Sequence, residues 1–193
     1  MKQHTIFNQW WLHLMQGILL LGLSLIQFLI QMDQIIIISK LTGFVAMLNG
    51  FLILVGHYLA TKEDGNRFNF LIGFSSCLIG VVFIAFLNYI NDFVYILHLV
   101  FLFLSSIYLL TNFWNYKSAI NWWWLNLVIL LTTFLVILII NVVLPKDLYI
   151  ASVLIGFQLF INGLFLILMS FAIRKFQLEF ELTIGQLKKE HLL

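Results

Sequence analysis

Six long apolar runs, separated by short polar segments, constrain this chain more than any other feature. Each run is long enough to cross the hydrocarbon core of a bilayer as a helix, which takes about 20 residues. A strand in lipid would leave backbone groups without partners, and the runs lack the alternation of barrel strands. The sequence therefore predicts an all-α integral membrane protein with six transmembrane helices. The runs are Trp10 to Ile30, Ile35 to Ala60, Phe68 to Tyr89, Phe93 to Phe113, Trp123 to Leu144 and Leu148 to Ile173.

Composition supports lipid as the solvent. The chain has 193 residues, of which 63% are hydrophobic and 9% are charged, whereas a soluble domain carries about 25% charged residues. The net charge of +2 is too small to indicate a nucleic-acid partner, and the single cysteine, Cys77, excludes an internal disulfide. We expect one six-helix domain over residues 1–175, with the lipid bilayer as its partner and a homo-oligomer left open.

The distribution of basic residues predicts the orientation. Helix ends on the side of both termini carry most of the lysines and arginines, and such residues favour the cytoplasm. We therefore expect a multi-pass protein of the bacterial cytoplasmic membrane with both termini in the cytoplasm. The residues on that side are Lys2, Lys62, Arg67, Lys117, Arg174, Lys175, Lys188 and Lys189, against Lys40 and Lys146 on the other, where each turn carries one aspartate (Asp33, Asp92 and Asp147).

The chain also contains an internal repeat. The phrase Gly-Phe-x-x-x-x-Asn-Gly begins at Gly43 and again at Gly156, 113 residues later, and a weaker middle copy has Ser105-Ser106 in place of Asn-Gly. A spacing of about 56 residues predicts three units of two helices, over approximately 10–66, 67–121 and 122–175. A unit with an even number of helices returns to its starting side. The units are therefore expected to be parallel, as three hairpins around a pseudo-threefold axis.

Small residues recur seven positions apart, which places each pair on one helix face. Lipid provides no hydrophobic force between helices, so close backbone contact at small residues replaces it. We expect these faces to contact other helices: Gly17 with Ser24, Gly43 with Gly50, Gly73 with Gly80, and Gly156 with Gly163.

These features resemble a known family. A Trp-led first helix with Gly-Ile-Leu-Leu-Leu from Gly17 to Leu21, then a second helix with Gly-x6-Gly, repeated over nearly the whole chain, resembles the HdeD family of bacterial acid-resistance membrane proteins. The resemblance implies an inner-membrane protein with six spans that is linked to survival at low pH. It supplies no catalytic residues. The Ser105-Ser106 copy and the long tail after Lys175 depart from the family's pattern.

Ionisable and amide groups inside the runs are costly, so each is a candidate for function. Lys40 has a stem long enough to reach the outer interface, towards Asp33, or it has an ion or proton role. His98 suits an acid sensor, because histidine titrates close to physiological pH, or it is a neutral hydrogen-bonded side chain. Asn49 and Asn162 are amides in mid-span that need partners, and interhelical hydrogen bonds or a substrate site would supply them.

A second set of polar residues recurs near the cytoplasmic helix ends. His13, Asn69 and Asn126 occupy one repeat position, and we expect a polar layer there around the pseudo-axis. The tail, residues 176–193, is amphipathic. Its period-two alternation suits a strand, but it could equally continue the sixth helix along the membrane.

The sequence contains no familiar catalytic motif: no His-Glu-x-x-His, no phosphate loop, no Gly-x-Ser-x-Gly and no acidic residue in mid-span. The leading hypothesis is a non-enzymatic membrane protein of the HdeD type, without cofactor or metal, in stress resistance or membrane organisation. The alternative is a small transporter or channel with a pathway along the pseudo-axis. A third hypothesis is a membrane-embedded enzyme that acts on lipid.

Overall fold

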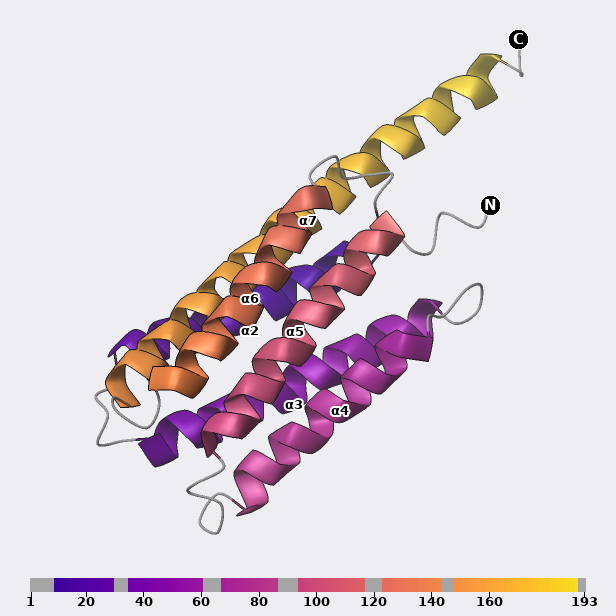
Figure 1. Cartoon of the computed structure of the whole chain (residues 1–193). Helices are drawn as coiled ribbons and strands as arrows, with labels where there is room; N and C mark the ends of the chain where they lie inside the picture. The colour runs from indigo at the N-terminus through magenta and orange to yellow at the C-terminus, as the bar shows by residue number, and fades with distance from the viewer. Residues whose placement is uncertain are drawn as a thin grey trace.

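The described part of the chain is helical throughout, apart from one turn residue. The computed structural model describes residues 9–29, 35–60, 67–86, 94–116, 123–143 and 148–190, and at several helix ends the backbone alone. The helices are α2 (Trp10–Leu29), α3 (Ile35–Ala60), α4 (Arg67–Phe86), α5 (Val94–Tyr116), α6 (Trp123–Val143) and α7 (Leu148–Glu190) (Figure 1). All-helical structure is confirmed. Each helix overlaps one predicted apolar run, and α7 extends beyond its run into the tail. The three aspartates of the outer turns and Lys2, Lys62, Lys117 and Lys146 lie outside the described residues.

Up to Glu190, the tail continues the sixth helix and does not form a strand. Helix α7 has 43 residues, about twice the number that a bilayer requires, and its last turns project from the bundle (Figure 1). Side chains four residues apart on a helix are neighbours. The Lys175 ammonium lies 3.9 Å from a carboxylate oxygen of Glu179, and Gln177 Nε2 donates to Glu181 Oε1 at 3.0 Å. These local pairs favour the helix over the strand.

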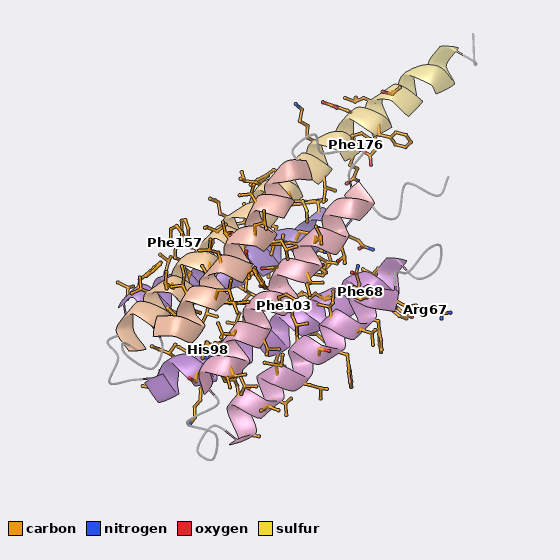
Figure 2. The ribbon with its side chains drawn as sticks, in the orientation of Figure 1. Arg67, Phe68, His98, Phe103, Phe157 and Phe176 are labelled. Carbon is orange, nitrogen blue, oxygen red and sulfur yellow. The ribbon has the colours of Figure 1, made fainter. Side chains whose placement is uncertain are left out.

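The outer surface of the bundle is apolar. Phe68, Phe103 and Phe157 are among many large hydrophobic side chains that are exposed along the helices (Figure 2). Helices α2, α3, α4 and α7 contain stretches long and apolar enough to cross a membrane, and α5 and α6 contain shorter ones over Ile96–Asn112 and Val128–Ile139 within the described residues. A surface of this kind is stable in lipid and not in water. The fold is that of a helical membrane protein.

Two helix pairs make the most extensive contacts in the bundle. Helix α3 packs along α4, and the first described helix, α2, packs along the last, α7. The contact between α5 and α6 is much smaller, and α5 also touches α3, α4 and α7. The α2–α7 pair joins the first and last described helices.

Glycines form the centre of the α3–α4 contact. A Cβ atom added to Gly50 would lie 2.6 Å from the carbonyl oxygen of Gly73. Two turns away, a Cβ atom added to Gly80 would lie 2.6 Å from the carbonyl oxygen of Gly43. These distances are shorter than any carbon–oxygen contact in a relaxed structure, so only glycine allows the two backbones to approach this closely.

The α2–α7 contact has two positions where small residues meet the partner helix, two turns apart. At one of them the backbones approach as closely as in the α3–α4 contact. A Cβ atom added to Gly17 would lie 2.7 Å from the carbonyl oxygen of Gly163. At the second position, a Cβ atom on Gly156 would lie 3.3 Å from both Gln27 and Phe28, and Ser24 is fully buried. Both glycine contacts join helices that the proposed repeat assigns to different units.

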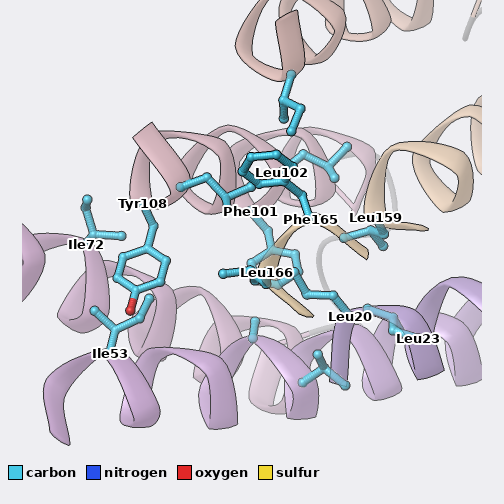
Figure 3. Packing of buried hydrophobic residues seen from close by; sticks show 14 of the residues in the cluster. Leu20, Leu23, Ile53, Ile72, Phe101, Leu102, Tyr108, Leu159, Phe165 and Leu166 are labelled. Carbon is cyan, nitrogen blue, oxygen red and sulfur yellow. The ribbon is translucent and has the colours of Figure 1, made fainter. Parts of the chain in front are cut away.

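Apolar side chains fill the space between the helices. Leu20 of α2, Leu102 of α5 and Leu166 of α7 belong to one continuous cluster (Figure 3). The cluster includes side chains from every described helix. The core is therefore shared by the whole bundle and not divided between separate hairpins.

The glycine contacts lead to a stability prediction. Leucine at both position 50 and position 163 forces the paired backbones apart, and overpacking of this kind typically costs about 1–3 kcal/mol at each site. Thermal unfolding of purified protein in mild detergent measures the loss.

Gly22→Leu is the matched control, because no atom lies within 4 Å of a Cβ at that position. Its stability should stay the same or rise, since glycine is a poor helix former by about 1 kcal/mol. A double variant that unfolds at the wild-type temperature would show that the glycine contacts do not stabilise the bundle.

Candidate functional site: a polar network in the bundle core

Five polar side chains meet at mid-height in the bundle. Ser105 and Ser106 come from α5, Thr133 from α6, and Gln158 and Asn162 from α7, and all five are buried. Each helix contributes its polar groups from the middle of an apolar run, so these groups cannot reach water. They must therefore find partners inside the protein.

The Thr133 hydroxyl is the acceptor at the centre of the network. It donates its own hydrogen to the backbone oxygen of Ile129 at 2.8 Å. It can therefore only accept from Gln158 Nε2, at 2.6 Å, and from the Ser106 hydroxyl, at 2.8 Å. Thr133 thus ties α6 to both α5 and α7.

Asn162 connects α7 to α5. Its Nδ2 group donates to the hydroxyl oxygens of Ser105 at 3.0 Å and Ser106 at 3.2 Å. The Ser105 hydrogen is directed to the backbone oxygen of Leu102 at 2.8 Å. Asn162 Oδ1 accepts from Gln158 Nε2 at 3.2 Å. Both amide groups have used all their donor hydrogens, since an NH₂ group has two.

The network is closed to most ligands. Within the described residues, Gln158 Oε1 is its one atom without a hydrogen-bond partner. A bound molecule would have to bring a donor to that oxygen, because no donor of the network is left for an anion or a carbonyl group. The arrangement is suited to holding three helices together.

The predicted counterpart of Asn162 is placed differently. Asn49 on α3 is buried, and its Oδ1 atom makes no hydrogen bond with any described residue. The network therefore contains one of the two predicted asparagines.

His98 is partnered within the core. Its Nε2 atom lies 3.1 Å from the hydroxyl oxygen of Thr42, and that hydroxyl lies 2.9 Å from the backbone oxygen of Ile38. If the Thr42 hydrogen is directed to Ile38, His98 donates through Nε2. The ring also meets Phe83 edge-on, with centroids 4.7 Å apart. His98 thus links α5 to α3 and α4, away from the five-residue network.

The remaining predicted residues lie outside the five-residue network. Lys40 lies on an exposed part of α3, outside the core. Asn69 accepts a hydrogen bond from Thr111 of α5 at 3.0 Å, and His13 lies near Tyr108 with ring centroids 6.1 Å apart. The side chain of Asn126 lies outside the described residues.

Sequence reasoning missed Gln158 and Thr133. A signal for Gln158 was available, because it stands four residues before Asn162 and so lies on the same helix face. No such signal marks Thr133, because Thr132 beside it has the same chemistry and differs only in the direction it faces.

No family model, no curated protein and no solved structure matches this chain. Among the described residues, no group of three or more His, Cys, Asp or Glu side chains is placed to hold a metal ion. The site and the fold therefore define a class, a helical membrane protein with a hydrogen-bonded core. Its function has to be inferred from the chemistry of its side chains.

Neighbouring threonines test the network. Thr133→Val removes the acceptor of two hydrogen bonds and leaves donors of Gln158 and Ser106 buried without partners. Such a loss typically costs about 1–3 kcal/mol. Thermal unfolding in detergent measures it.

Thr132→Val is the control, because the Thr132 hydroxyl bonds only to the backbone oxygen of Ile129 on its own helix, at 2.9 Å. The control should change the unfolding temperature little. Equal losses in the two variants would contradict a network that joins helices.

Proposed function

We propose that the protein is a non-enzymatic, six-span membrane protein of the HdeD type, which supports acid or stress resistance by organising the bacterial inner membrane. The observation that carries this proposal is the closed network at mid-membrane. A transporter or an enzyme would need polar groups that are free to bind a ligand. In this network the polar groups form hydrogen bonds with one another. Their arrangement supports a packed structural role.

The contacts between helices support the proposed repeat. Gly50 faces Gly73 and Cys77, whereas Gly163 faces Gly17 and Leu21. Gly163 lies 113 residues after Gly50. Gly73 and Cys77 lie 56 residues after Gly17 and Leu21. One interface therefore recurs in the same register, between the second helix of one unit and the first helix of the next.

The same shifts align buried positions on the three second helices, α3, α5 and α7. In the proposed pseudo-threefold arrangement these positions form layers along the axis. The layer at Asn49, Ser105 and Asn162 is polar. The layers on either side are apolar and fully buried: Ala46, Leu102 and Leu159 on one side, and Ile53, Leu109 and Leu166 on the other.

These apolar layers bear on the channel hypothesis. A hydrated pathway along the axis would have to pass both, and each is composed of side chains with almost no exposed surface. The layers favour the structural role over the pathway.

The membrane boundary is marked at one end of the bundle. The guanidinium carbon of Arg174 lies 4.6 Å from the centroid of a Trp10 ring. Tryptophan prefers the headgroup level and arginine prefers the cytoplasmic side. This pair supports a cytoplasmic location for the start of α2 and for the α7 extension.

Reporter fusions test the orientation. A fluorescent protein fused after position 193 should fluoresce, because it folds in the cytoplasm, and alkaline phosphatase at the same position should be inactive. The reverse result would place the α7 extension outside the cytoplasm.

Deletion of the gene tests the function. Deleted cells should survive an acid challenge less well than the parent, and a plasmid copy should restore survival. Thr132→Val serves as a control variant that restores it fully, and the Gly50→Leu, Gly163→Leu double variant should not.

Unchanged survival of the deletion strain would contradict the acid-resistance role. Purified protein in liposomes should leave permeability to protons, potassium and small neutral solutes unchanged, and a clear flux would favour the channel alternative.

A further inference from the structure

Helix α7 has two opposite faces with different surroundings. One face is packed into the bundle and includes the buried residues Asn162, Leu166 and Ile173. The opposite face lies on the outside of the bundle, where Figure 2 shows Phe157. Six large apolar side chains on this face are exposed: Phe157, Leu164, Leu168, Phe171, Leu178 and Leu182. Together with Ile161 and Lys175 they form the outer stripe of α7.

The outer stripe has the spacing of a coiled coil. From Phe157 to Leu182, its members alternate between four and three residues apart. This is the spacing of the a and d positions in a heptad repeat, and an apolar pattern of that kind over about three to four heptads indicates a seam between two helices. The a positions are Ile161, Leu168, Lys175 and Leu182, and the d positions are Phe157, Leu164, Phe171 and Leu178.

Lipid covers only part of the outer stripe. The stripe is about 38 Å long, from a rise of about 1.5 Å per residue, whereas the hydrocarbon core is about 30 Å thick. Arg174, which lies over the Trp10 ring, marks the membrane boundary. Leu182 stands beyond Arg174 by about 12 Å along the axis, and the headgroup layer on each side is about 5–8 Å thick. The end of the stripe therefore stands in water.

The α7 extension holds these leucines away from the membrane surface. Helix α7 is continuous from Leu148 to Glu190, and beyond Arg174 it runs on in the same direction (Figure 1). A helix that keeps this direction cannot lie along the headgroups. The exposed fraction is 52% for Leu178 and 69% for Leu182. A short helix with apolar side chains in water is stabilised by packing that face against another helix.

The charges beside the outer stripe fit a parallel copy of the same helix. Arg174 occupies a g position and Glu179 the following e position. Residues at g and e form the ion pairs between the helices of a coiled coil, so Arg174 of each helix meets Glu179 of a second copy. Lys175 is the one polar residue of the stripe, and its ammonium lies 3.9 Å from a Glu179 carboxylate oxygen. A single polar residue at an a position fixes the register and the oligomeric state.

We propose that two copies of this chain form a parallel dimer along the outer stripe of α7. Copies inserted in the same orientation have parallel α7 helices, so a two-fold axis along the membrane normal relates them. Within lipid the two stripes associate by side-chain packing, and beyond the headgroups each copy covers Leu178 and Leu182 of the other. This dimer goes beyond the proposed function and does not rest on the acid-resistance role.

Disulfide cross-linking tests the dimer, because identical residues at a and d positions meet across the two-fold axis. The full-length chain without its one cysteine, Cys77→Ala, is reconstituted in liposomes, and single cysteines are introduced and oxidised. Leu182→Cys should form a covalent dimer several times faster than Thr183→Cys, and dilution with excess lipid should leave that ratio unchanged. Thr183 is the matched control, because it is exposed on the same turn but lies outside the stripe.

Charge reversal tests the register. Glu179→Arg places like charges at the paired g and e positions, so it should slow cross-linking at Leu182→Cys several-fold. Adding Arg174→Glu restores opposite charges and should restore the rate. If Cys77→Ala does not fold, the same cysteines are placed in the wild-type chain, whose own cross-linking is then the background.

Two results would overturn the dimer. One is the absence of a covalent dimer in both Leu178→Cys and Leu182→Cys, which would assign the stripe to lipid or to a different protein. The other is equal cross-linking of Leu182→Cys and Thr183→Cys, which would indicate random collision. An unchanged rate in Glu179→Arg would overturn the parallel register that pairs Arg174 with Glu179.

Discussion

Close backbone contact at glycine is the interaction on which this bundle depends. Apolar side chains gain little by leaving lipid for a protein interior, so helices associate through packing and hydrogen bonds. The α3–α4 and α2–α7 pairs use packing, at Gly50 against Gly73 and at Gly17 against Gly163. The α5–α6 pair lacks glycine, since Leu99 and Leu130 occupy the aligned positions. There, the hydrogen bond between Thr133 and Ser106 takes over, and the bond between Gln158 and Thr133 joins α7 to α6. One physical requirement is thus met in two ways.

The choice of helix pairs determines how the chain closes. Because α2 packs on α7, the first and last described helices are joined, and neither end of the bundle is left as a loose hairpin. Joining helices so distant in sequence costs loop-closure entropy, although this cost grows only slowly with the separation. The glycine seam between these helices, with Arg174 over the Trp10 ring at its end, compensates for that cost. The α7 extension then continues from a helix that is held along its length.

The sequence predicted the helices well because length and apolarity are local properties. The limits of α3 agree at both ends, and the small residues that the repeat singled out lie at helix contacts. Two matters were beyond its reach. Which helices pair depends on the rotation of each helix about its own axis. The presence of glycines on both α3 and α4 does not show that these glycines face each other. Partners such as Thr133 and Gln158 depend on the same rotations. The tail was ambiguous because its alternation of Leu and Glu competes with pairs such as Lys175 and Glu179.

Two buried glutamines of the core stand where the proposed repeat is broken. Gln158 aligns with Val45 and Phe101, and Gln16 aligns with Ile72 and Ile129, all of them buried. Most positions that agree between units are apolar or small and hold the helices together, and Asn49 and Asn162 are the polar exception. The positions that disagree introduce amides into a core that did not need them for packing. At Gln158 the added amide is absorbed by a network with no spare donor, which leaves a structural link.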